Sequence, residues 1–161
     1  MSEERKNHKK GVLEVSAIEN GTVIDHIPPT SLFKVIKLLG LDRTTHQVTF
    51  GTNLQSKRIG TKAIIKIADK DCADEEIGYI SLVAPSARIN IIRDYEVAEK
   101  RVVEVPTHVE GFVKCGNPMC VTNQEPHIRT RFDVFTRNGE LALRCKYCEK
   151  ITAQEQIEII R

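Results

Sequence analysis

The sequence predicts an α+β protein built as two small domains, with an antiparallel sheet and two helices in the N-terminal domain and mainly strands in the C-terminal one. Two observations predict this organisation. Apolar residues alternate with polar ones in most segments but recur at three- and four-residue spacing in one of them, residues 32–39. In addition, four of the five cysteines fall in the last third of the 161-residue chain. A chain of this length has room for two such domains.

The segment up to Ile27 predicts an arm followed by strand structure. Residues 1–11 are charged and polar, and we expect a mobile arm because they offer too little apolar surface to offset the entropy of ordering. Alternating apolar residues then predict strands over 12–18 and 23–27, or one bent strand, with a turn at Asn20–Gly21.

Two helices and further strands complete the N-terminal domain. The first helix is predicted from Ser31 to Leu39, where the apolar spacing is helical, and Gly40 ends it. The order of strand, helix, strand, strand, helix, strand is the ferredoxin-like pattern, in which two helices cover one face of the sheet. The later elements are expected as strands 47–53 and 61–67 in a hairpin, a helix over 73–83, and strands 87–92 and 95–97.

A four-cysteine motif marks the C-terminal third of the chain. The spacing is C-x4-C, then 24 residues, then C-x2-C, and tetrahedral zinc takes four thiolates from two such pairs. Since a domain of about 50 residues has too small a core to fold alone, metal binding would also supply folding energy. We therefore expect a β-rich zinc-ribbon (rubredoxin-like) domain that holds one structural Zn²⁺ ion per chain. The predicted ligands are Cys115, Cys120, Cys145 and Cys148.

Composition and charge narrow the class of protein. The sequence shows no signal peptide and no apolar run of about 18 residues, so we expect a cytoplasmic protein without a membrane partner. In a reducing compartment two disulfides are the weaker alternative to the metal. The net charge of +2 is too small to indicate nucleic acid as a partner. A nucleic-acid-binding zinc-ribbon protein stays the alternative function, although few aromatic residues are available for stacking on bases.

The N-terminal domain carries side chains that suit an anion. Lys62 and Lys66 share one face of a predicted strand, which suits a polyphosphate but is also common on solvated strands. Asp25 and His26 are adjacent, so they point to opposite faces and form no catalytic dyad. Cys72 has acidic neighbours that raise the pKa of its thiol, and an enzyme based on this cysteine is not expected. The residues alone therefore lead no further than a possible anion site.

Several separate segments together resemble one known family. They are LEVSAIENGTVIDHIP, GTKAIIKI, APSARINIIRDYEV, CGNPMC and LRCKYCEK, and they resemble the regulatory chain of aspartate carbamoyltransferase from about residue 12 to 150. The resemblance implies a non-catalytic subunit that binds ATP as an activator and CTP and UTP as inhibitors, and thereby controls the committed step of pyrimidine biosynthesis. It also implies two protein partners, the catalytic chain and a second regulatory chain in a homodimer.

The resemblance implies a nucleotide site in the N-terminal domain. The backbone at 17–18 would read the base edge, while Asp25 and Lys66 would contact the ribose. His26 and Lys100 would bind the phosphates. The whole implied set is Val15, Ala17, Ile18, Val23, Asp25, His26, Lys62, Lys66, Asn90, Ile92, Tyr95, Val97 and Lys100.

The resemblance also implies how the chain is divided into functional domains. We expect the arm at 1–11, a nucleotide-binding allosteric domain at 12–100, a linker at 101–109 and a zinc-binding domain at 110–161. Ser16 and Met119 stand where relatives can carry an acidic and a polar residue, respectively. The residues expected near the catalytic chain are Asn117, Lys146, Tyr147, Glu149 and Lys150.

Overall fold

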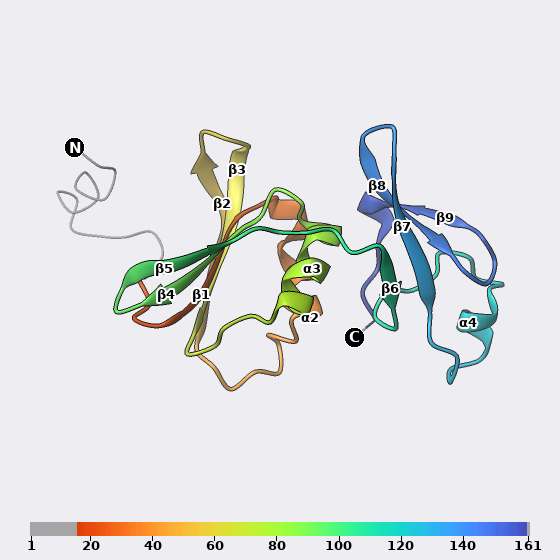
Figure 1. The fold of residues 1–161 in the computed structure, drawn as a ribbon, viewed down its shortest axis with the longest axis horizontal. Coiled ribbons are helices and arrows are strands. Elements are labelled where there is room, and N and C mark those ends of the chain that lie inside the picture. The colour runs from red at the N-terminus through yellow and green to blue at the C-terminus, as the bar shows by residue number, and fades with distance from the viewer. Residues whose placement is uncertain (1–15, 161) are drawn as a thin grey trace.

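The computed structural model describes residues 16–160, which form two antiparallel sheets with a layer of helices between them (Figure 1). The expected mobile arm at 1–11 and the first part of the strand expected at 12–18 lie outside the described residues, and residues 16–18 adopt no strand. Over residues 16–160, no helix is both long enough and apolar enough to cross a bilayer.

The N-terminal sheet has five strands and carries two helices on one face. Its elements are β1 (Gly21–Ile27), the short 3-10 helix η1 (Pro29–Ser31), α2 (Leu32–Leu38), β2 (Val48–Ser56), β3 (Gly60–Ala68), α3 (Asp74–Val83), β4 (Arg88–Arg93) and β5 (Glu96–Arg101). The strand order β2-β3-β1-β4 with the two helices is the predicted ferredoxin-like arrangement, and β5 adds an edge strand as a hairpin partner of β4. The predicted α+β class is thus confirmed.

The two faces of this sheet differ in chemistry. Along β3, the side chains of Ala63, Ile65 and Ile67 are fully buried and pack toward the helices. The alternate residues, Lys62 and Lys66 among them, are only partly buried on the opposite face. Among residues 16–160 no helix covers that second face, so this part of the chain leaves it open (Figure 1).

The C-terminal sheet has four strands in sequence order and is small and β-rich, as predicted. Its elements are β6 (His108–Glu110), α4 (Val121–Gln124), β7 (Arg131–Arg137), β8 (Glu140–Cys145), β9 (Ile151–Ala153) and the 3-10 helix η2 (Gln154–Gln156). The central hairpin pairs Phe132 with Cys145, which places one of the four cysteines beside a fully buried ring. β6 begins inside the stretch predicted as a linker.

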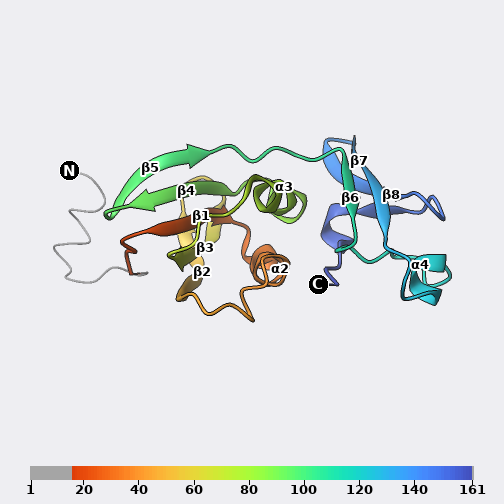
Figure 2. The same cartoon turned by 60° about the horizontal axis from the view of Figure 1, so that its bottom comes forward.

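The helix layer contacts both domains (Figure 2). The ring of Tyr79 on α3 lies 4.1 Å from that of Phe112, centroid to centroid. The side-chain amide of Gln154 donates to the carbonyl of Leu82 on α3 at 3.1 Å, and the ammonium of Lys34 on α2 donates to the carbonyl of Glu155 at 3.1 Å. Helices that support the N-terminal sheet therefore also form the junction with the C-terminal domain.

Candidate metal centre and cationic sheet face

The four cysteines of the C-terminal motif converge at one point. All four sulfur atoms lie within 4.8 Å of one another, and none forms a disulfide. The Sγ atoms of Cys115 and Cys148 are 3.5 Å apart, and those of Cys120 and Cys145 are 3.7 Å apart. A tetrahedral ion with metal–sulfur bonds of about 2.3 Å requires sulfur–sulfur distances of about 3.8 Å. The cluster therefore fits a single tetrahedral metal ion.

Local hydrogen bonds hold the two cysteine loops in this geometry. In the first loop the side-chain amide of Asn123 donates to the carbonyls of Cys115 and Asn117, at 2.9 and 2.7 Å. In the second loop the backbone N–H of Tyr147 donates to Cys145 Sγ at 3.4 Å. The hydroxyl of Thr122 lies 3.2 Å from Cys120 Sγ, where it donates to the sulfur. Such donors stabilise thiolates, which are the form that binds a metal.

Burial opposes ionisation of these thiols in the absence of a metal. It raises the pKa of Cys115 to about 12 and also raises that of Cys145. For Cys148, burial acts in the same direction, but hydrogen bonds led by the Lys150 amide outweigh it and lower the pKa to about 7. The four thiols would hold a divalent cation, whose charge would make all four thiolates favourable.

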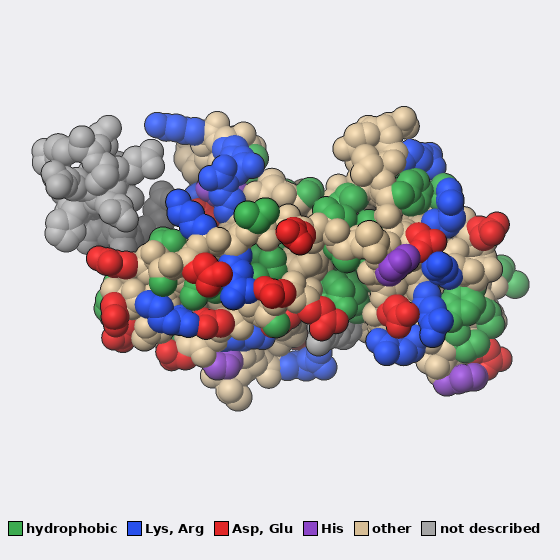
Figure 3. Space-filling view, viewed as in Figure 1, with side chains coloured by type: hydrophobic (Ala, Val, Ile, Leu, Met, Phe, Trp, Pro, Cys, Tyr) green, Lys and Arg blue, Asp and Glu red, His purple; other side chains and the backbone are tan. Residues whose placement is uncertain are grey.

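The open face of the N-terminal sheet brings cationic and polar side chains into rows. Strand register aligns Val23 of β1 with Lys66 on one side and with Asn90 on the other, and Asn90 in turn aligns with Lys100 of β5. These four residues belong to the set implied for nucleotide binding, and they come from four different strands. Figure 3 shows Lys and Arg side chains gathered at the β2–β3 end of this domain.

A second row lies beside the first and centres on Asp25. Lys62 Nζ lies 2.9 Å from Asp25 Oδ1 and 3.2 Å from Oδ2, so this carboxylate is neutralised. His26 has a φ of 58° at a bulge in β1, and its backbone N–H donates to Asp25 Oδ1 at 2.7 Å. The left-handed backbone at His26 turns the side chains of Asp25 and His26 toward the same side of the sheet. The regular alternation of a strand would place them on opposite faces.

Burial controls the charge of two groups on this face. It lowers the pKa of His26; Asp25 opposes that shift, and the nearby cations Lys62, Arg88 and Arg58 reinforce it. Burial likewise lowers the pKa of Lys66, with Asp25 opposing and Lys62 reinforcing the effect. His26 is therefore mainly neutral near pH 7 in the free protein.

The remaining described residues of the implied nucleotide set lie in or beside the β4–β5 hairpin. Tyr95 and Val97 are 66% and 51% exposed in the β4–β5 hairpin. The Tyr95 backbone N–H donates to the carbonyl of Glu19 at 2.9 Å, which ties the segment carrying Ala17 and Ile18 to that hairpin. Ile92 is buried within β4, and Val15 lies outside the described residues.

Cys72 offers no site of its own. Its side chain is 2% exposed, and burial, reinforced by Glu76, raises the pKa of the thiol to about 11. Its backbone N–H donates to the Thr22 hydroxyl at 3.2 Å. A buried, protonated thiol of this kind serves packing rather than nucleophilic chemistry.

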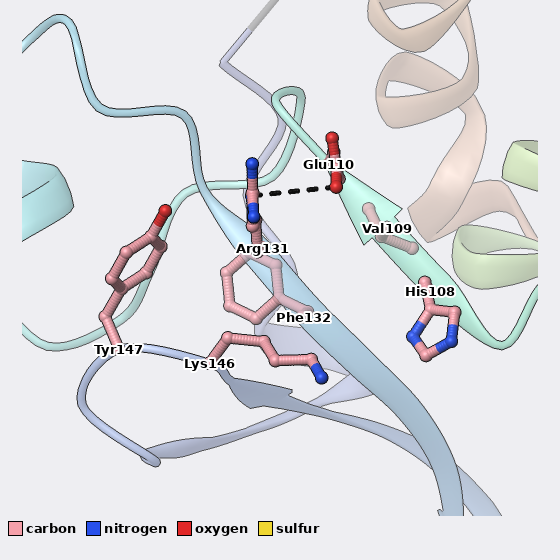
Figure 4. Close-up of a pocket in the computed structure, with 7 residues that line it drawn as sticks. All are labelled: His108, Val109, Glu110, Arg131, Phe132, Lys146 and Tyr147. Carbon is pink, nitrogen blue, oxygen red and sulfur yellow. Dashed lines mark ion pairs between the residues drawn. The ribbon is translucent and has the colours of Figure 1, made fainter.

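A shallow groove on the C-terminal domain lies close to the second cysteine loop (Figure 4). Lys146 and Tyr147 form one side of it, and Arg131, 3.6 Å from the Glu110 carboxylate, lies opposite. The Asp133 carboxylate accepts from His108 Nδ1 at 2.9 Å and pairs with Lys146 Nζ at 3.3 Å. The groove holds about 470 Å³ and is lined by His108, Val109, Glu110, Arg131, Phe132, Lys146 and Tyr147.

Comparison with known families accounts for both domains. The family model for the aspartate carbamoyltransferase regulatory chain, allosteric domain, matches residues 13–104, and that for its metal binding domain matches residues 107–158. The chain belongs to the aspartate carbamoyltransferase regulatory chain family. The resemblance found in the sequence is thereby confirmed, and so is the expectation of a non-catalytic regulatory subunit.

Similar regulatory chains are found in several organisms. The chain is 53% identical over 152 residues to the aspartate carbamoyltransferase regulatory chain of Porphyromonas gingivalis, covering 94% of this chain and 99% of the relative. It is 51% identical over 154 residues to that of Bacteroides fragilis, with coverage of 96% and 99%. It is 48% identical over 147 residues to that of Pyrococcus horikoshii, with coverage of 90% and 95%. As a regulatory chain, it has a catalytic chain as its partner.

Proposed function

We propose that this regulatory chain binds ATP, CTP and UTP on the open face of its N-terminal sheet and so controls the committed step of pyrimidine biosynthesis. The observation that supports this most is the alignment of Lys66, Asn90 and Lys100 on three strands of one uncovered face. Ammonium and amide groups at such spacing suit a ribose and its phosphates. ATP acts as the activator, whereas CTP and UTP inhibit.

Within this site the resemblance to the family implies a role for each group. The backbone at 17–18 reads the base edge, and Asp25 with Lys66 contacts the ribose. His26 and Lys100 bind the phosphates, since both carry or can acquire positive charge. The proposed site also includes Val23, Lys62, Asn90, Ile92, Tyr95 and Val97, which contribute to its surface and charge, and Val15, which lies outside the described residues.

The metal in the C-terminal domain is one structural Zn²⁺ ion bound by the four clustered thiolates. Tetrahedral all-sulfur coordination leaves no position for water or substrate, so the ion supplies folding energy rather than catalysis. The shaped surface near Asn117 and the loop at 146–150 then contacts the catalytic chain. We place the functional boundaries at 12–100 for the allosteric domain, 101–109 for the linker and 110–161 for the zinc-binding domain.

The regulatory mechanism requires a route from the sheet to the catalytic chain. Nucleotides with different bases favour different arrangements of the assembly, and differential affinity for those arrangements is the whole source of control. The α2–α3 layer contacts both domains, so a shift of the sheet passes to the C-terminal domain through Tyr79 and Phe112. Regulatory chains pair as homodimers in the cytoplasm, which gives the assembly an interface with two arrangements.

Calorimetric titration with CTP and with ATP tests the proposed site. We expect Lys66→Ala to lower the affinity for CTP and for ATP roughly tenfold, because a charge-assisted hydrogen bond is lost. Lys37→Ala removes the same charge from an exposed position of α2, on the covered side of the sheet, and serves as the control. Titration heats that stay unchanged in Lys66→Ala, with the metal retained, would reject the assignment.

A further inference from the structure

Two arginines stand beside the proposed nucleotide site without a role in it so far. Arg88 begins β4 and aligns with Asp25 of β1, so it continues the row that contains Lys62. Arg58 lies in the turn between β2 and β3, where the hydroxyl of Ser56 accepts the backbone N–H of Ile59 at 3.3 Å. Both arginine side chains are exposed.

One pocket joins the two arginines to the proposed site. It holds about 330 Å³ and is lined by Arg58 and Arg88 together with Asn90 and Lys100. Asn90 and Lys100 already belong to the first row of the sheet face, so the pocket is continuous with that row. Its remaining lining comes from the segments 85–87, 101–103 and Ile89.

The charges in this pocket are only partly balanced. Arg101, which also lines the pocket, pairs with Asp74 and Glu99, but among residues 16–160 neither Arg58 nor Arg88 forms an ion pair with a carboxylate. Both arginines line the same pocket, and both disfavour a positive charge on His26. Two guanidinium groups that converge without a carboxylate create a region of positive potential, which favours a multiply charged anion.

We propose that Arg58 and Arg88 bind the terminal phosphates of a nucleoside triphosphate and make this site prefer triphosphates to monophosphates. The inference rests on the proposed nucleotide function and adds a basis for its selectivity. A guanidinium presents N–H donors in a fork that matches two phosphate oxygens, so two such groups suit the β- and γ-phosphates. His26 and Lys100 then remain for the phosphate nearest the ribose.

Calorimetric titration of the full metal-loaded chain with CTP and with CMP tests this proposal. In the double variant Arg58→Gln/Arg88→Gln we expect CTP affinity to fall at least tenfold, because two charge-assisted contacts are lost. CMP affinity should change less than about twofold, since it has no terminal phosphates. Arg137→Gln removes the same charge from an exposed position at the end of β7 and should leave both affinities unchanged.

The outcomes separate this inference from the function on which it rests. If the double variant keeps the unmodified chain's ratio of CTP to CMP affinity, the arginines do not select the terminal phosphates. If the unmodified chain binds neither CTP nor CMP, the proposed nucleotide function is itself wrong. The variant Arg58→Lys/Arg88→Lys should recover part of the preference for CTP, because it keeps the charge but loses the fork. Equal thermal unfolding curves would show that the variants fold.

Discussion

Single residues on the N-terminal sheet gain their roles from the face of the strand they occupy. Lys62 and Lys66 are two residues to either side of Ile64, and both project from the uncovered face, yet their surroundings differ. Lys62 is committed to the Asp25 carboxylate, whereas burial lowers the pKa of Lys66 and keeps its ammonium poorly solvated. A poorly solvated ammonium gains more from an incoming anion than a hydrated one does.

His26 makes nucleotide affinity depend on pH. Burial holds its pKa below 6.5 in the free chain, and a bound phosphate stabilises the imidazolium and raises that pKa. Binding therefore takes up a proton between the two pKa values, so affinity for CTP should rise as the pH falls from about 7.5 to about 6, by at most tenfold per pH unit. Calorimetry at several pH values measures this slope.

The variant His26→Asn isolates the contribution of the imidazole. Asparagine tolerates the left-handed backbone at this position better than most residues, so the bulge in β1 is kept. CTP itself also gains a proton in this range, and both proteins share that part of the slope. An identical pH dependence in the two proteins would show that His26 does not contact phosphate.

Among the elements, the start of β1 depends on one glycine. Gly21 has a φ of 138°, and a Cβ atom at this position would lie 2.0 Å from the carbonyl oxygen of Ile67 on the neighbouring strand. We expect Gly21→Ala to lower the free energy of unfolding of the N-terminal domain by about 3 kcal/mol, since neither backbone can move without breaking the ladder. Urea unfolding followed by circular dichroism measures the change.

Gly60 supplies the matched control for that substitution. Its φ is 83°, but nothing lies within 4 Å of the position where a Cβ would be. Gly60→Ala should therefore cost only about 1 kcal/mol, the penalty for a left-handed backbone alone. Equal costs in the two variants would mean that the contact with Ile67 relaxes freely.

The elements also show which helices and strands the sequence can predict and which it cannot. α2 and β3 were predictable because their buried residues follow a helical and a strand period, respectively. α3 was predictable from the acidic residues of its first turn and the proline at position 85. β5 extends to Arg101, well beyond the predicted 97, because its side chains from 96 to 100 are all exposed and show no alternation. The three-residue strands β6 and β9 are too short for any period to be visible.

One candidate site could be predicted from local sequence, and the other depends on the tertiary fold. Cysteine spacing alone predicted that four thiols converge, since two short loops determine most of that geometry. The convergence of Arg58 with Arg88 could not be predicted, because it depends on how the β2–β3 turn lies relative to β4. Strand period would have put Arg88 on the face of Asn90, and that signal was available in the sequence.

At the scale of the whole molecule, the two domains pack against each other through the helix layer. The apolar core runs from Ile65 and Leu82 through the junction to Val113 and Phe132 without interruption. A change in sheet geometry on one side therefore meets close-packed side chains rather than a loose hinge. This continuity is what a chain needs in order to pass a ligand signal from one domain to a partner bound at the other.

Removing the metal should separate the two activities of the chain. The C-terminal core is small, and the thiolate–metal bonds contribute folding energy of about 10 kcal/mol or more, so chelation should unfold this domain and abolish association with catalytic chains. Nucleotide binding should persist within about threefold, because the cationic rows belong entirely to the five-stranded sheet. A sizing column run with catalytic chains measures the first effect, and calorimetry with CTP measures the second. Metal-free chain that still co-migrates with catalytic chains would contradict a structural role for the ion, and restored co-migration after zinc is added back would support it.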